Sequence, residues 1–353
     1  MQLKFVKVVP LKTPMIGQNE ESTIKIEIIC EIASAHEGNI ETLFELLHCA
    51  DRSGSDWVKL QIYQFDKLVA SDNDKFADLK IIELSPKEWV KILDFAEKLQ
   101  IKLIIEPFDY DSFLLVRNHP AIDGFKIPTS DLLDARFVSD VLAEGKIVFI
   151  AVGGTELKEL DVIMGAAKEN KNTEIILLHG FQNFPTKLED SLLNKIPSFI
   201  GRYDCRVGFA DHIDASDQEL SRVLPSMAIA AGASIIEKHL TLDRDKKSYD
   251  YYSALNPDEF DRFVQHIHTV AQALGHHDLR ILSEAELSYR HNMKKFAVVS
   301  EDIAAGSLLD LSKISYKRTA EPGLTHSDMS GCVHKKFRHF MQKNRIIRSN
   351  DFE

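Results

Sequence analysis

Eight short apolar runs, rich in β-branched residues, recur at intervals of about 25 to 35 residues with longer amphipathic stretches between them. Each run is almost continuously apolar, which is typical of a strand buried on both faces of a parallel sheet. The repeat predicts an α/β fold that closes as a (β/α)8 TIM barrel. The expected strands span residues 25–33, 57–63, 102–105, 124–127, 147–152, 174–178, 206–210 and 234–237.

Helix boundaries are indicated by capping residues. Ser85–Glu88 and Asn256–Glu259 each combine an N-cap side chain, a proline at the first helical position and a glutamate that completes a capping box. Ser216–Glu219 offers a third box of this kind. Gly54 and Gly275 are expected to end helices, because glycine readily adopts the left-handed conformation found there.

The pattern changes near Lys294, where short strand-like runs and turn residues replace the long helices. Strands are expected over residues 296–300 and 315–317. The sequence therefore predicts two domains, a barrel over residues 1–285 and a small domain over residues 294–353. Residues 1–23 are expected to form an N-terminal hairpin that closes one end of the barrel.

Composition excludes several classes of protein. A formal net charge of −11 argues against a nucleic-acid or anionic-membrane surface, because such surfaces need an excess of Lys and Arg. No apolar run approaches the roughly 20 residues of a membrane-spanning helix. The four cysteines are scattered without a Cys-x-x-Cys spacing. We therefore expect reduced thiols and a cytoplasmic location.

Polar residues lie at the ends of seven of the eight apolar runs. Catalytic groups of a TIM barrel project from the C-terminal ends of its strands, so these residues are the candidates for chemistry. At any one position a salt bridge or a solvated rim is the alternative. In chain order the candidates are Glu31, His36, Lys59, Gln61, Glu106, Lys126, Thr129, Asp131, His179, Gln182, Asp211, His212, Glu237, Lys238 and His239.

Two pairs of candidates indicate a kind of ligand. His212 and His239 follow neighbouring strands, and two imidazoles suit a divalent transition metal such as Mn, Fe or Zn. Hydrogen-bonded core histidines are the alternative. Lys59 and Lys126 are point charges suited to a phosphate or carboxylate, unless they are unrelated surface lysines.

Six ordered motifs resemble those of the sialic acid synthase family. They are EIASAHEGN from Glu31, VKLQ from Val58, FKIPTSD from Phe125, LLH with PT from Leu177 and Pro185, GFADH from Gly208 and IEKH from Ile236. After Lys294, the stretches 298–303 and 316–318 resemble the family's C-terminal antifreeze-like (SAF, β-clip) domain. The same group includes the pseudaminic, legionaminic and spore-coat polysaccharide synthases.

The resemblance implies a transferase that condenses phosphoenolpyruvate with an N-acyl hexosamine aldehyde to give a nonulosonic acid. His212 and His239 would hold a divalent metal, manganese in the family, with magnesium or another divalent ion as the alternative. The implied catalytic residues are Glu31, Lys59, Lys126 and Asp211, and the implied substrate contacts are Gln61, Glu106, Thr129, Asp131, Gln182, Phe184, Asp250 and Arg318. The resemblance also implies a homodimer in which Arg318 reaches the partner's barrel.

The chain departs from the family pattern at several of these positions. Glu106 replaces the serine or threonine that usually follows the third strand, and Ala151 and Ala210 replace serines after the fifth and seventh. Phe184 stands where the family has tyrosine, and the Pro-Gly pair after Arg318 is missing. An ionised glutamate only accepts hydrogen bonds and repels phosphate, so these changes predict weak binding of phosphoenolpyruvate.

Three hypotheses remain open at this level. The first is a metal-dependent synthase that forms a carbon–carbon bond. The second is a diverged barrel homologue that acts as a binding or assembly protein in polysaccharide biosynthesis. The third is a metal-dependent sugar isomerase or hydrolase, which would need neither the two lysines nor the C-terminal domain.

Overall fold

The computed structural model describes residues 25–353 except 171, 184, 276–277 and 279. The predicted N-terminal hairpin and Phe184 lie outside the described residues. The chain divides into two compact units, of which the first ends at Gly275. The helix α11 (Glu284–Met293) therefore belongs to the second unit, whereas the sequence had placed the domain limits at residues 285 and 294.

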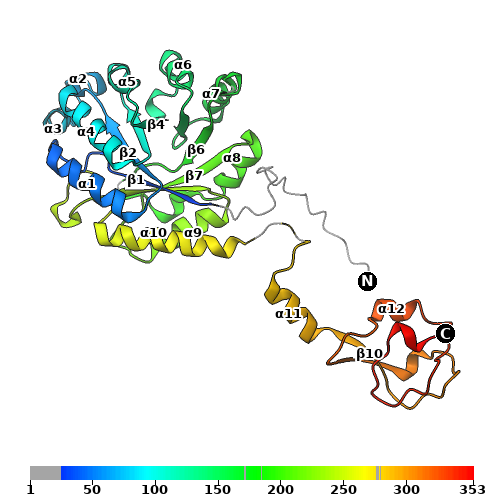
Figure 1. The fold of residues 1–353 in the computed structure, drawn as a ribbon. Coiled ribbons are helices and arrows are strands. Elements are labelled where there is room, and N and C mark those ends of the chain that lie inside the picture. The colour runs from blue at the N-terminus through cyan, green and yellow to red at the C-terminus, as the bar shows by residue number, and fades with distance from the viewer. Residues whose placement is uncertain (1–24, 171, 184, 276–277, 279) are drawn as a thin grey trace. The chain divides into compact units, whose positions relative to one another are not determined.

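The first unit is a closed barrel of parallel strands, as the sequence predicts (Figure 1). Each strand pairs with the next in sequence order, and pairing of the first strand with the eighth closes the barrel. The strands are β1 (Glu27–Glu31), β2 (Trp57–Ile62), β3 (Leu103–Pro107), β4 (Ile122–Ile127), β5 (Ile147–Ala151), β6 (Ile175–His179), β7 (Arg206–Asp211) and β8 (Ile235–Leu240). A two-residue strand, β9 (Ala254–Leu255), pairs with the end of β8.

Helices surround the barrel (Figure 1). They are α1 (Ile40–Ser53), α2 (Phe65–Leu68), α3 (Phe76–Ile82), α4 (Pro86–Leu99), α5 (Tyr110–Val116), α6 (Ala135–Ala143), α7 (Leu157–Glu169), α8 (Lys195–Tyr203), α9 (Leu220–Ala230) and α10 (Pro257–Ala271). The capping boxes at Ser85 and Asn256 are confirmed, and Gly54 ends α1 with φ of 76°. The box predicted at Ser216 is wrong, because α9 begins at Leu220 and Asp217 Oδ1 accepts from the Leu220 N–H instead.

Side chains alternate across each strand, so the barrel has an apolar layer inside it and another between the strands and the helices. The inner layer consists of Ile29, Trp57, Ile104, Phe149, Ile176, Leu178 and Ile235. The much larger outer layer joins the other strand residues to the buried faces of the helices. The inward-facing polar residues at the strand ends lie above the inner layer, at the C-terminal mouth of the barrel.

The second unit has a small core of its own. Strands β10 (Lys295–Val299) and β11 (Ile314–Arg318) form an antiparallel pair, and α12 (His326–Ser330) follows them. Both strands were predicted from the sequence. Buried residues such as Ala297, Met329 and Phe337 form the core of this unit.

A glycine holds the loop after β6 close to β7. Gly180 has φ of +129°, and a Cβ built on it would lie 2.2 Å from the carbonyl oxygen of Ala210. This carbonyl also accepts a hydrogen bond from the His212 ring. Only glycine therefore lets the two loops meet beside His212.

We expect Gly180→Ala to destabilise the protein more than Gly54→Ala. Both glycines have positive φ, which costs about 1–2 kcal/mol for alanine, but a Cβ on Gly54 would meet nothing within 4 Å. The clash at Gly180 should add about 1–3 kcal/mol. Urea unfolding of the two variants measures the difference, and equal losses would show that the loop yields to the methyl group.

Candidate active site

The mouth of the barrel contains a cluster of buried charges centred on Lys59. Its ammonium group pairs with the carboxylates of Glu31 and Glu106 and lies 3.5 Å from Glu237 Oε2. The side chain of Lys59 is only 1% exposed. Strands β1, β2, β3 and β8 contribute one member each, so the cluster exists only when the barrel is closed.

Lys126 joins the same cluster from β4, the strand next to β3. Its Nζ lies 3.0 and 3.3 Å from the two carboxylate oxygens of Glu237 and 3.5 Å from Glu106 Oε2. The amide of Gln61 also donates to Glu106 Oε2, at 3.5 Å. The structure thus brings together five of the predicted residues, Glu31, Lys59, Gln61, Glu106 and Lys126.

The cluster has more negative than positive charge. Three carboxylates face two ammonium groups, which leaves one net negative charge. Burial favours the neutral form of Glu237, but the ammonium groups of Lys126 and Lys59 outweigh it and lower the pKa of this carboxyl to about 2. Burial opposes the charge on Lys126 as well, yet Glu106 and Glu237 raise its pKa. For Lys59 burial prevails and lowers the pKa.

Glu31 differs from the other carboxylates of the cluster. Both of its oxygens are buried and neither forms a well-aligned hydrogen bond within the described part of the chain, although Lys59 lies within ion-pair distance. An ionised carboxylate can accept several hydrogen bonds. Glu31 therefore keeps open acceptor positions at the floor of the mouth, as a group that takes or gives a proton requires.

His212 and His239 lie side by side at the ends of β7 and β8, with ring centroids 5.2 Å apart. Burial lowers the pKa of His212 to about 4 and that of His239 well below its ordinary value, so both rings are neutral at pH 7. His212 Nδ1 lies 3.1 Å from the carbonyl oxygen of Ala210, to which it can only donate. That tautomer leaves the lone pair of Nε2 free.

This arrangement fits a divalent metal. A histidine that binds a metal through one nitrogen normally donates its other N–H to a carbonyl or carboxylate, as His212 does. A divalent cation beside the rings would also offset the net negative charge of the cluster. His212 and His239 are thus a suitable pair of ligands for such an ion.

Other predicted substrate contacts lie in the loops around the mouth. Gln182 Nε2 donates to Asp250 Oδ1 at 2.5 Å, which joins the loops after β6 and β8. Burial raises the pKa of Asp250, although the hydrogen bond from Gln182 and the charge of Lys59 both act to lower it. Thr129 donates to the Ala151 carbonyl oxygen at 3.3 Å, and burial raises the pKa of nearby Asp131.

Two of the residues to which the resemblance gives a catalytic or substrate role lie elsewhere, and the candidate His179 points to the Ser191 carbonyl oxygen. Asp211 is buried and accepts a hydrogen bond from Lys238 at 2.8 Å on the outer face of the barrel, which does not support the predicted catalytic role. The reason is strand alternation, because its neighbour Ala210 occupies the inward position. Arg318 ends β11 in the second unit, where it is exposed and forms no ion pair with any described residue.

Glu237 belongs to the site although the sequence prediction gave it no role. It was noted at a strand end, yet it bridges the two lysines from β8. The alternation of side chains along β8 could have predicted that Glu237 faces the mouth. His239 was predicted to face the mouth, and a residue two positions earlier in a strand faces the same side.

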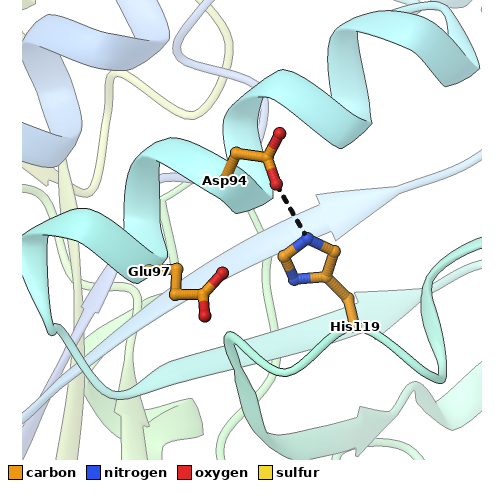
Figure 2. Close-up of side chains that lie close together, drawn as sticks. All are labelled: Asp94, Glu97 and His119. Carbon is orange, nitrogen blue, oxygen red and sulfur yellow. Dashed lines mark hydrogen bonds and ion pairs between the residues drawn. The ribbon is translucent and has the colours of Figure 1, made fainter.

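A second group of possible metal ligands lies outside the barrel, where Asp94 and Glu97 of α4 approach His119 (Figure 2). His119 Nδ1 accepts a hydrogen bond from the Ala121 N–H at 3.2 Å, and Nε2 lies 3.3 Å from Asp94. Nε2 therefore carries the proton in the neutral ring. This is the reverse of the arrangement at His212 and does not favour a metal.

Comparisons with known proteins agree with this architecture. The chain is 29% identical to pseudaminic acid synthase of Campylobacter jejuni over 83% of this chain and 87% of that protein. It is 25% identical to N,N'-diacetyllegionaminic acid synthase of Legionella pneumophila over 88% and 90% of the two chains. The crystal structure of an N-acetylneuraminic acid synthetase from Leptospira borgpetersenii, in complex with citrate, superposes with a TM-score of 0.69 at 24% identity, covering 76% of this chain and 92% of that one.

No helix of the described residues is long and apolar enough to cross a membrane.

The sequence pattern of the NeuB family matches residues 46–278, which is well over half of the chain. The same stretch contains the strands β2 to β8 with Lys59, Glu106, Lys126, Glu237 and both histidines. The chain therefore belongs to the NeuB family.

Proposed function

We propose that this protein condenses phosphoenolpyruvate with an N-acyl hexosamine aldehyde to give a nonulosonic acid for a surface polysaccharide. The observation that carries the proposal is the buried cluster in which Lys59 and Lys126 meet three carboxylates beside two neutral histidines. An isomerase or hydrolase has no need of the two convergent ammonium groups. The names of the synthases to which the chain is similar support the same reaction class.

In this reaction the methylene carbon of phosphoenolpyruvate forms a bond to the aldehyde carbon, water adds to the resulting cation, and phosphate leaves. Lys59 and Lys126 bind the carboxylate and phosphate of the donor as point charges. Glu31 has open acceptor positions and can accept the proton that the attacking water gives up. A divalent metal, manganese or a similar ion, held by His212 and His239 would polarise the aldehyde oxygen as a Lewis acid.

The sugar is expected to meet the loop residues. Gln61 and Glu106 lie on neighbouring strands, and Gln182 and Asp250 approach from loops after β6 and β8. Amide and carboxylate groups suit the hydroxyl and N-acyl groups of an amino sugar because together they donate and accept hydrogen bonds. Which amino sugar is used depends on these loops.

Glu106 favours a second candidate function. Its carboxylate pairs with Lys59 and approaches Lys126, the same two groups that the donor needs. A protein with this feature can be a diverged homologue that binds another ligand or assembles with enzymes of polysaccharide biosynthesis. The two functions differ in whether phosphoenolpyruvate binds at all.

Arg318 supports a proposal about assembly. Residues 276–353 contain 13 Lys and Arg against 10 Asp and Glu, whereas residues 1–275 contain 30 against 44. A basic small unit, with a guanidinium that pairs with no described carboxylate, is complementary to an acidic barrel. We propose a homodimer in which Arg318 serves the partner's site, with the small unit as the family's SAF domain.

We expect His239→Ala to abolish binding of the divalent ion that the wild-type protein retains. The variant leaves one imidazole, which is too few for a stable site. Metal analysis after dialysis against Mn²⁺ measures this, and His119→Ala is the matched control because the Ala121 N–H donates to its Nδ1. Equal metal content in wild type and His239→Ala would refute the site.

We expect weak binding of phosphoenolpyruvate by the wild type and tighter binding by Glu106→Thr. The change removes a repelling charge and adds a donor, and one charge-assisted hydrogen bond contributes about 1.5–3 kcal/mol, or roughly tenfold in affinity or more. Calorimetry with Mn²⁺ present measures both. Glu106→Gln removes the charge at constant shape and should show part of the gain.

The two candidate functions give different calorimetric results. Recovery of donor binding in Glu106→Thr would show that the rest of the pocket is intact. Absence of binding in both proteins would favour the binding or assembly function. Tight wild-type binding that Glu106→Thr leaves unchanged or weakens would show that the carboxylate does not oppose the donor.

We expect a dimer in light scattering at micromolar concentration. The complementary charges of the two units should make the dimer sensitive to salt, since screening weakens exposed charge pairs. Arg318→Ala should leave the mass unchanged if the residue serves the site and not the interface. A monomer would contradict the proposed assembly.

A further inference from the structure

Directly behind the two histidines lies an ion pair that the proposed reaction does not use. Lys238 Nζ donates to Asp211 Oδ2 at 2.8 Å, and both side chains are fully buried, with 0% exposure. The two residues are partners in the register of β7 and β8. On its other side Lys238 is in register with Cys30 of β1, which belongs to the apolar layer between the strands and the helices.

Stability alone does not explain a charged pair in this layer. Removing two charges from water costs about as much as their attraction returns, and apolar residues of similar volume are often equally stable or more so. A pair of this kind is best explained by a geometry that apolar side chains cannot impose. Because the pair lies next to His212 and His239, the geometry it could impose is the relative placement of these two rings.

The Asp211 carboxylate acts on both histidines at once. Its Oδ1 accepts a hydrogen bond from the Ile213 N–H at 3.1 Å, which closes the backbone turn around His212. Its Oδ2 accepts from Lys238, the residue immediately before His239. One carboxylate thus joins the turn that presents His212 to the strand that presents His239.

We propose that the Lys238–Asp211 pair positions the two histidines for a divalent metal. It fixes β7 against β8 at the mouth, so that the rings keep their separation of 5.2 Å and their interplanar angle of 56°. Lys238 and Asp211 are positioning residues, because neither touches the metal or the substrate. The inference rests on the proposed role of His212 and His239 as metal ligands.

The test is the double variant Lys238→Met with Asp211→Asn. The net charge of the pair stays the same, and the amide that replaces the carboxylate keeps an oxygen for the Ile213 N–H, so only the link between the two strands is lost. We expect the affinity for Mn²⁺, measured by calorimetry, to fall about 10- to 100-fold, as for other residues that orient metal ligands. The visible absorption spectrum of bound Co²⁺ should change as well, because it reports the ligand geometry.

A control removes ion pairs at the N-terminal end of β7, where Arg206 pairs with Glu27 of β1 and with Glu174. Arg206 begins β7 and its Nη2 lies 2.6 Å from Oε1 of Glu27, which begins β1. The double variant Arg206→Met with Glu27→Gln should keep the wild-type Mn²⁺ affinity and Co²⁺ spectrum, even where urea unfolding shows a loss of stability. An equal loss of affinity in the control would overturn the proposal, since any ion pair of the barrel would then have the same effect.

Wild-type affinity and an unchanged Co²⁺ spectrum in the Lys238→Met, Asp211→Asn variant would also overturn it. If that variant does not fold, Lys238→Arg is the alternative, because it keeps the ion pair but changes the position of the positive charge. It should weaken Mn²⁺ binding and shift the Co²⁺ spectrum. Unchanged Mn²⁺ affinity and an unchanged Co²⁺ spectrum would overturn the proposal. Failure of the wild type to bind either ion would instead refute the metal site of the proposed function, and this inference with it.

Discussion

The mouth of this barrel depends on charges that are buried together. Lys59 is almost fully enclosed, and a lone ammonium group in such a place would lose its proton or unfold its surroundings. Glu31, Glu106 and Glu237 make its charge tolerable, and they in turn require Lys59 and Lys126. Removing either lysine would leave the carboxylates that it pairs with uncompensated. The cluster therefore behaves as one unit, and a substrate must exchange with part of it.

The fold brings these groups together through two simple rules. Parallel strands end at the same side of the barrel, and side chains alternate between its inside and outside. Lys59, Glu106, Lys126 and Glu237 occupy inward positions just above the apolar layer of Ile29 and its neighbours. The outward positions next to them in their strands hold apolar residues except at Lys238, which pairs with Asp211. An anion that enters from solvent meets the polar layer and cannot pass the apolar one.

Much of this could be predicted from the sequence. The eight strands of the barrel were located to within a few residues, because strands buried on both faces are continuously apolar. The convergence of Lys59, Lys126 and Glu106 followed from their places at strand ends. The outward direction of Asp211 and the bridging role of Glu237 were missed, since residues were assigned to the mouth by nearness to a strand end without regard to strand parity. The cap of α9 was missed because Ser216 and Asp217 are both good capping residues and only the tertiary turn decides between them.

The histidines show what structure adds to residue type. The sequence cannot distinguish His119 with two nearby carboxylates from His212 with one nearby histidine, and by ligand count the first looks the better metal site. The hydrogen bond at Nδ1 of each ring favours His212 over His119 as a metal ligand. His119 Nδ1 faces an N–H, so its other nitrogen carries the proton, whereas His212 Nδ1 faces a carbonyl, so its other nitrogen offers a lone pair. Backbone groups thus decide which nitrogen of each imidazole offers its lone pair, and at His212 those groups belong to the turn that Asp211 closes, which suits the proposed metal.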